Sequence, residues 1–232
     1  RGLGDVYKRQ HFFPGGTLLK SYDLVHWEIA AHVFERLDDT PAEQLEGEQS
    51  IYGKGMWAAS LRYHKDTFYV CFASYDTGKT YIYRTKNINE SWEKCCLDGV
   101  YHHPSLLFDE DGRIYMGYGF NEVRILELND TLTAPKEGGF ERRLVEEKQD
   151  AYISYEGAHF YKKDGTYYIF VIQWLKGNLT HREQLCLYGD SLDGEFKKEM
   201  LFSENLGSPM KGVAQGGIVD TPEGDWYSVM YQ

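Results

Sequence analysis

Short runs of aromatic and β-branched residues, each bounded by glycine, aspartate or asparagine, recur along the chain. Such runs are typical of β-strands. They lie at Thr67–Phe72, Thr80–Arg84, Arg113–Tyr118, Thr166–Val171 and Asp225–Met230. No window of about 11 residues keeps a helical period of apolar positions well enough to predict a helix. The pattern therefore predicts an all-β protein.

Four of the strand runs follow similar short turns that carry an acidic residue. An Asp-Gly between two apolar runs is a strong hairpin signal, because the turn requires a positive φ. The turn acids are Asp66, Asp111, Asp164 and Glu223, roughly 45–60 residues apart. Antiparallel units repeated at about this spacing predict the blades of a β-propeller. A β-sandwich with accidental similarity between its hairpins is the alternative.

The position eight residues before each turn acid falls at the start of the strand that precedes the hairpin. These positions hold Ala58, His103, Glu156 and Gln215. If each unit is a blade and this strand is its innermost, the four positions converge at one end of the axial channel. Three of the four are polar in otherwise apolar strands, so the register predicts an active site there.

Glu156 is the candidate acid of that site. Its neighbours Tyr155 and Gly157 are expected to leave the carboxyl partly desolvated, an environment that favours a protonated carboxyl and suits a general acid. The alternative is a glutamate at a strand entry that caps a backbone amide or faces solvent.

The other two polar positions suggest contacts rather than chemistry. His102 and His103 are expected to point to opposite faces of a strand, with no third ligand evident, so a structural or substrate-contacting role is favoured for His103 over metal binding. Gln215 is followed by two glycines, as expected where backbone approaches a ligand or a crowded axis. Phe13 and Trp57 lie beside glycines and could stack on sugar rings, or pack between blades.

Net charge, apolar content and cysteine spacing limit the kinds of partner and the cellular location that can be expected. The formal net charge is −11, with 36 acidic and 25 basic residues, which argues against a nucleic-acid partner. No run of about 18 apolar residues exists to span a membrane as a helix. The four cysteines, Cys71, Cys95, Cys96 and Cys186, show no metal-ligand spacing and are expected to be free thiols, which slightly favours the cytoplasm of a bacterium.

The motifs together resemble glycoside hydrolase family 43, which contains β-xylosidases and α-L-arabinofuranosidases. The resemblance rests on an ordered set of segments: Ser21–Trp27, Trp57–His64, Pro104–Gly112 and Glu156–Gly165. It implies a five-bladed β-propeller and an inverting hydrolysis with two carboxylates. The implied substrates are plant-derived oligosaccharides with terminal xylose or arabinose.

The resemblance also implies roles for individual residues. Glu156 matches the general acid, and His103 falls where the family has an aspartate that tunes this acid. Gln215 falls where the family often has a histidine beside an axial calcium ion, which weakens the case for that metal, so no cofactor is expected. Phe13 and Trp57 match segments that line the sugar subsite.

The two ends of the chain look incomplete. Residues 1–10 resemble a translated sequencing adaptor and are expected to be non-native, and residues 11–232 are expected to be a partial propeller whose first and last blades are cut short. By resemblance the general base precedes His11, so the chain alone is expected to be inactive and, with open strand edges, to express poorly. A catalytically lapsed propeller that binds glycans is the alternative function; a sialidase or fructosidase is disfavoured.

Overall fold

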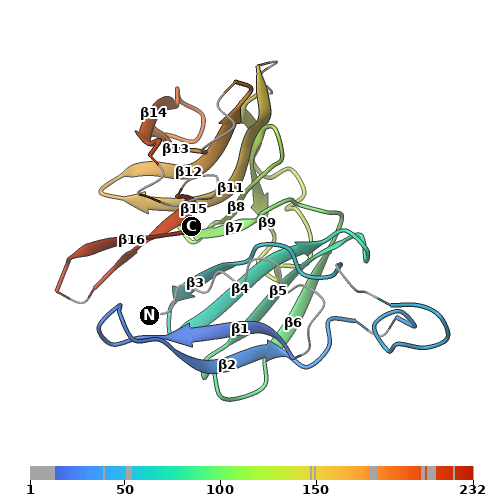
Figure 1. Cartoon of the computed structure of the whole chain (residues 1–232). Helices are drawn as coiled ribbons and strands as arrows, with labels where there is room; N and C mark the ends of the chain where they lie inside the picture. Colours follow the sequence, from blue (N-terminus) through green and yellow to red (C-terminus); the bar gives the residue numbers. More distant parts are fainter. Residues whose placement is uncertain are drawn as a thin grey trace. The chain divides into compact units, whose positions relative to one another are not determined.

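The described part of the chain is built from β-strands alone, as the sequence predicts. We analysed a computed structural model, which describes residues 14–38, 40–50, 54–146, 148, 150–177, 182–204, 207, 213–221 and 223–231. Sixteen strands and no helix occur in these residues (Figure 1). The same residues accordingly contain no helix with the length and apolarity needed to cross a membrane.

The chain divides into two compact units, and each is described by itself. The first unit comprises residues 1–101 with 131–134, and the second comprises residues 102–130 with 135–232. The boundary falls between Tyr101 and His102. The polar positions His103, Glu156 and Gln215 therefore belong to the second unit, whereas Ala58 belongs to the first.

The first unit contains a two-stranded and a four-stranded antiparallel sheet. The strands are β1 (Gly15–Lys20), β2 (Glu28–Phe34), β3 (Ser60–His64), β4 (Thr67–Ser74), β5 (Lys79–Thr85) and β6 (Glu93–Asp98). Strands β3 to β6 pair in chain order, and Lys65 and Asp66 form the β3–β4 turn with positive φ values of 46° and 58°. The turn acid thus has the conformation that the sequence pattern requires.

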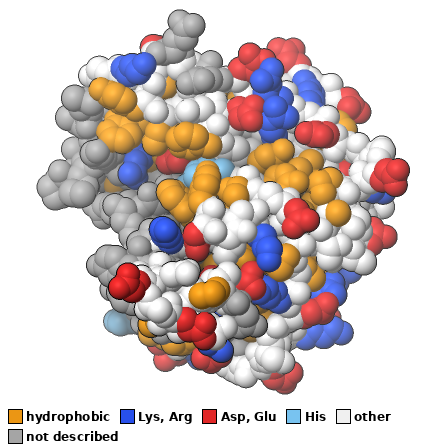
Figure 2. All heavy atoms as spheres, turned by 90° about the vertical axis from the view of Figure 1, so that its right-hand side faces the viewer, with side chains coloured by type: hydrophobic (Ala, Val, Ile, Leu, Met, Phe, Trp, Pro, Cys, Tyr) orange, Lys and Arg blue, Asp and Glu red, His pale blue; other side chains and the backbone are white. Residues whose placement is uncertain are grey.

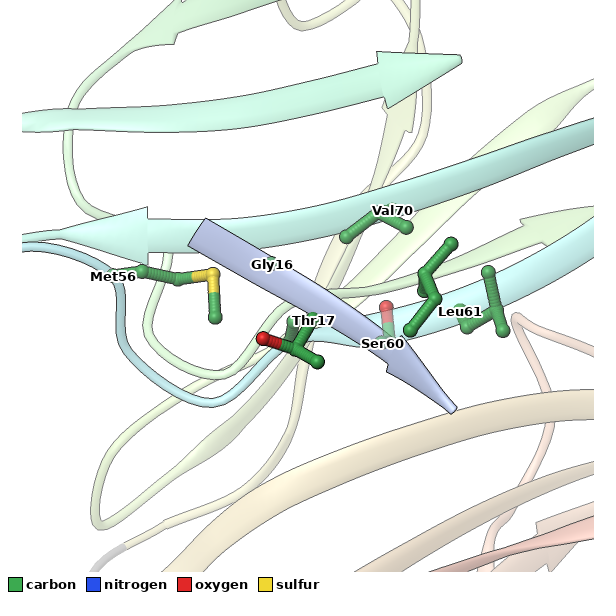
Figure 3. Close-up of a pocket in the computed structure, with 8 residues that line it drawn as sticks. Gly16, Thr17, Met56, Ser60, Leu61 and Val70 are labelled. Atoms are coloured by element: carbon green, nitrogen blue, oxygen red, sulfur yellow. The ribbon is translucent and has the colours of Figure 1, made fainter. Parts of the chain in front are cut away.

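Stacked aromatic rings form the core of the first unit. The ring of Phe34 in β2 lies 5.6 Å from that of Phe72 and 5.4 Å from that of Tyr83. A small pocket, with space for about one water molecule, lies where β1 passes β3 and β4 (Figure 3). Its lining includes Gly16, Thr17, Met56, Ser60, Leu61 and Val70.

The second unit contains two four-stranded sheets and one two-stranded sheet, all antiparallel. The strands of the first sheet are β7 (Ser105–Phe108), β8 (Ile114–Tyr118), β9 (Val123–Leu128) and β10 (Glu141–Val145). Those of the second sheet are β11 (Ala151–Lys163), β12 (Thr166–Leu175), β13 (Glu183–Gly189) and β14 (Lys197–Phe202). The third sheet pairs β15 (Ala214–Asp220) with β16 (Trp226–Tyr231).

The predicted hairpins and the observed sheets agree closely. Each turn acid lies in the first hairpin of its sheet: Asp111 between β7 and β8, Asp164 between β11 and β12, and Glu223 between β15 and β16. Asp164 and Gly165 adopt φ values of 51° and 83°. Strand β12 extends to Leu175, beyond the expected end at residue 171, because it stays paired with β11 and β13.

Strand β11 occupies the centre of the second unit. It packs against β7, β8 and β15 as well as pairing with β12. The backbone N–H of Phe160 donates to Ser105 Oγ at 2.9 Å, and Tyr161 Oη accepts from the backbone N–H of Ile218 at 3.0 Å. These hydrogen bonds fix β11 to the first strands of the two neighbouring sheets, where the polar positions lie.

Candidate active site

Glu156 lies in an irregular part of β11. The strand's register with β12 shifts on both sides of Glu156, and Gly157 adopts a left-handed φ of 72°. The side chain is buried, with 8% of the residue exposed. Tyr155 packs in the hydrophobic core of the unit. His102 lies beside the Glu156 carboxylate, with its Nε2 3.5 Å from Glu156 Oε2.

His102 and His103 do not point to opposite faces, so that expectation is wrong. The pair precedes β7 rather than lying in a strand, and His103 has a φ of 47°. This left-handed conformation turns both imidazoles to the same side, where they stack with ring centroids 3.9 Å apart. Glu156 lies beside His103, as the register predicts, and His102 joins them, which was not expected.

The loop between β8 and β9 borders the two histidines. The backbone N–H of Gly119 donates to the carbonyl of His102 at 2.9 Å, and that of Asn121 donates to the carbonyl of Tyr155 at 2.8 Å. Between these two anchors, the ring of Phe120 stands edge-on to His102 at 5.1 Å and is 47% exposed. Phe120 therefore places a fixed, partly exposed aromatic ring next to the Glu156–His102 pair.

Gln215 enters the site from β15. Its backbone has a φ of 60°, and its side chain lies against His103, with Nε2 3.5 Å from His103 Nδ1. The next backbone amide, that of Gly216, donates to Gln184 Oε1 at 3.2 Å. The glycines after Gln215 allow close approach, as predicted: a Cβ on Gly217 would lie 2.4 Å from the hydroxyl of Tyr161.

Burial makes His103 a neutral residue. The loss of water around its ring, together with the charges of His102 and His159, holds the pKa of His103 well below its usual 6.5. At neutral pH His103 therefore adds no fixed charge beside Glu156, whereas the aspartate implied at this position by the family resemblance would add a negative one.

The structure brings together three of the five residues predicted to form the site: His103, Glu156 and Gln215. Phe13 lies outside the described residues. Trp57 belongs to the first unit, where it is partly buried and contacts the ring of Tyr75 edge-on at 5.3 Å. The catalytic and binding roles assigned to these residues stay predictions.

Two of the residues found at the site, His102 and Phe120, were not predicted from the sequence to belong to it. His102 is set aside because a regular strand would point it away from His103. Phe120 follows Gly119, and an aromatic residue after a glycine is the sequence signal that could have drawn attention to it.

The surface charge is of mixed sign on the face that Figure 2 shows. On the face shown in Figure 2, acidic and basic side chains are interspersed among hydrophobic ones. The small pocket of Figure 3 lies in the first unit and is lined mainly by apolar groups, so it offers no acid–base chemistry.

The site thus combines a buried glutamate in β11 with two imidazoles just before β7, in sheets built from antiparallel hairpins. The chain matches the description "Glycosyl hydrolases family 43" over residues 6–232 and belongs to this family. The sequence motifs indicate the same family.

Relatives with assigned activities agree with that membership. The chain is 26% identical to a β-xylosidase of Formosa agariphila over 251 residues, covering 97% of this chain and 42% of the relative. It is 30% identical to a non-reducing end α-L-arabinofuranosidase of Bacteroides ovatus over 230 residues, covering 94% of this chain and 41% of that protein. The chain therefore spans about two-fifths of the length of these curated relatives.

Solved structures show the same fold. A bifunctional GH43-CE protein of Bacteroides eggerthii superposes with a TM-score of 0.86 at 34% identity, over 96% of this chain and 28% of that one. An α-L-arabinanase of Cellvibrio cellulosa superposes with a TM-score of 0.72 at 18% identity, over 94% of this chain and 80% of that one, a likeness of fold alone.

Proposed function

We propose that this chain is part of a glycoside hydrolase that releases terminal xylose or arabinose from plant-derived oligosaccharides. The observation that carries the proposal is the buried Glu156 carboxyl, 3.5 Å from His102 Nε2 in a family 43 chain. The names of the relatives, β-xylosidase and α-L-arabinofuranosidase, support the pentose substrates.

In the proposed reaction Glu156 is the general acid. It protonates the glycosidic oxygen as the bond to the anomeric carbon breaks, and a water molecule attacks the opposite face of the sugar. Inversion needs a second carboxylate about 6.5–9.5 Å from the first to accept a proton from that water. Family resemblance assigns this base to a segment before His11, so we propose that the 232-residue chain alone has no turnover.

His102 has a supporting part in this proposal. The His102 imidazole, with Nε2 3.5 Å from Glu156 Oε2, holds the carboxyl in position to give its proton to the leaving group. The neighbouring ring of His103 is neutral and buried, so it holds His102 in place by stacking rather than by charge.

We also infer the complete architecture as five blades. The three four-stranded sheets would be whole blades, and the two-stranded sheets β1–β2 and β15–β16 would be parts of two others. The order of the hairpins along the chain and the likeness to family 43 structures support this count.

The alternative function is a lapsed propeller that binds glycans without cleaving them. Its support is His103, which by family resemblance falls where a tuning aspartate is expected and which carries no negative charge. Both functions take a carbohydrate, so turnover rather than binding distinguishes them.

The decisive experiment uses the full reading frame with nitrophenyl β-xyloside and α-L-arabinofuranoside. The enzyme hypothesis expects turnover in the wild type and a loss of at least about 10³-fold in Glu156→Gln, because the leaving group then departs without a proton. Glu199→Gln, on the exposed face of β14, is the matched control and should keep full activity. Absence of turnover in the wild type, with glycan binding retained, would favour the lapsed propeller.

A further inference from the structure

His102, His103 and Glu156 form a cluster of metal-binding groups. Each residue offers one donor atom, and these three atoms all lie within 4.8 Å of one another. All three residues are more than nine-tenths buried. Two imidazole nitrogens and a carboxylate oxygen are a donor set that zinc binds in proteins, with a water or substrate completing the coordination.

The spacing of the donors comes close to that of a zinc site. Zinc bonds to nitrogen and oxygen are about 2.0–2.2 Å long, which places tetrahedral donors about 3.4 Å apart. His102 Nε2 and Glu156 Oε2, at 3.5 Å, already have this separation. The stacked ring of His103 has to turn so that its lone pair converges on the same ion, a movement of about 1.4 Å at most.

Gln215 provides an independent sign of a missing ligand. Its side chain is seated against His103, and the residue is only 4% exposed. Among the described residues, its Oε1 has no hydrogen-bond partner. A buried acceptor without a donor is unfavourable, because it has lost its hydrogen bonds to water without replacement. A metal-bound water beside His103 would donate the hydrogen bond that this oxygen lacks.

The donors do not fit the axial calcium ion that the family resemblance suggests. Calcium takes about six to eight oxygen ligands, from carboxylates, carbonyls and waters. The described side chains here present two ring nitrogens and a single carboxylate. The residue at the calcium-linked position, Gln215, is instead engaged with His103.

We propose that His102, His103 and Glu156 bind a divalent ion of the zinc type, with Gln215 Oε1 accepting a hydrogen bond from a water on that ion. Binding of the ion occupies the carboxylate that the proposed hydrolysis uses as its acid. Zinc is therefore an inhibitor of the reaction, and this consequence rests on the proposed function, whereas the binding itself does not.

The test is zinc binding to the 232-residue chain after treatment with a chelator, measured by competition with a chromogenic zinc indicator. We expect one zinc ion per chain and no displacement by excess calcium. His103→Asn, which keeps a residue that tolerates a left-handed backbone, and Glu156→Gln should each weaken binding at least 100-fold. Gln215→Ala should weaken it by about 10–100-fold, the effect expected of an outer-shell hydrogen bond.

Two control variants guard against binding elsewhere. His32→Ala removes an exposed histidine of the first unit, and Cys96→Ser removes a partly exposed thiol; neither should change the affinity. Circular dichroism verifies that each variant is folded. Absence of saturable binding, or an affinity that His103→Asn and Glu156→Gln leave unchanged, overturns the proposal. Because the readout is metal binding, such a result leaves the proposed hydrolysis to be judged by its own assay.

Discussion

At the candidate site, the Gln215 side chain occupies the space that a side chain on Gly157 would fill. A Cβ placed on Gly157 would lie 2.8 Å from Cγ of Gln215, and Gly157 has a left-handed φ of 72°. The missing side chain in β11 is what lets the Gln215 side chain reach His103 from β15. The backbone of one strand thus determines where a functional group of another strand lies.

Replacement of Gly157 by alanine should therefore have two effects. An L-residue at this φ costs about 1–2 kcal/mol, and the clash with Gln215 adds to it, so we expect a loss of about 2–4 kcal/mol in the free energy of unfolding. Chemical denaturation measures this loss.

The control for Gly157→Ala is Gly165→Ala in the β11–β12 turn. Gly165 has a similar φ of 83°, but no atom lies within 4 Å of its added Cβ. Gly165→Ala should therefore lose only the free energy of unfolding that an L-residue at this φ costs. Equal losses for the two variants would mean that the contact with Gln215 has no energetic weight.

Truncation of Phe160 should be among the most destabilising changes in the second unit. The side chain is fully buried in the second half of β11, within the core of the unit. Removing a buried phenylalanine side chain costs about 3–5 kcal/mol, because apolar contacts are lost and a cavity remains. Phe160→Ala is compared by thermal unfolding with Tyr152→Ala, a change at a half-exposed ring of the same strand that should cost less than about 1 kcal/mol.

Asp109 anchors the β7–β8 hairpin to β11 and β12. Its carboxylate accepts hydrogen bonds from Lys162 Nζ at 2.5 Å and from the hydroxyl of Tyr167 at 2.6 Å. Burial opposes ionisation, but these hydrogen bonds outweigh it and lower the pKa of Asp109 below its usual 3.8. The ionised side chain is thus stabilised by the fold.

Asp109→Asn should lower the free energy of unfolding by about 2–3 kcal/mol at neutral pH, because Lys162 loses its buried partner. A depressed carboxyl pKa contributes stability above the unfolded-state pKa, and this contribution disappears as pH falls through the folded-state value. The difference between wild type and variant should therefore shrink in acid. Glu110→Gln, a neighbouring acid whose side chain is 84% exposed, is the control; a loss as large as that of Asp109→Asn would contradict the assignment.

His103 should make stability depend on pH below about 7. Its pKa is lowered in the folded chain, so below about 6.5 the unfolded chain binds a proton that the folded chain does not. Stability therefore falls with falling pH, by up to about 1.4 kcal/mol per unit of pH. Urea unfolding at several pH values should show this slope reduced in His103→Asn and retained in His32→Asn.

The hairpins could be predicted from the sequence because their determinants are local. Asp66 and Asp164 each sit in a turn between apolar runs, and a turn requires the same positive φ whatever surrounds it. A constant offset from repeated turns gives equivalent places in repeated sheets. For this reason the sequence also predicted that His103, Glu156 and Gln215 lie close together.

The expectation about the histidines was wrong for a reason that the sequence does not reveal. Alternation of side chains holds only in an extended strand, and the left-handed His103 breaks it just before β7 begins. Whether a non-glycine residue takes that conformation depends on its packing. Here the contact with Gln215, far away in the chain, accompanies it.

The sequence by itself determined that the chain is all-β, where its hairpins turn, and that its ordered motifs are those of family 43. The first two properties follow from turn chemistry and from the pairing of strands that are neighbours in the chain, both of which are local; the third is a likeness of motifs. Only the tertiary structure decided that His102 lies against Glu156, that His103 is neutral, and that Gln215 fills the space that Gly157 leaves open. Such relationships depend on burial and on strands far apart in the chain, which no local pattern specifies.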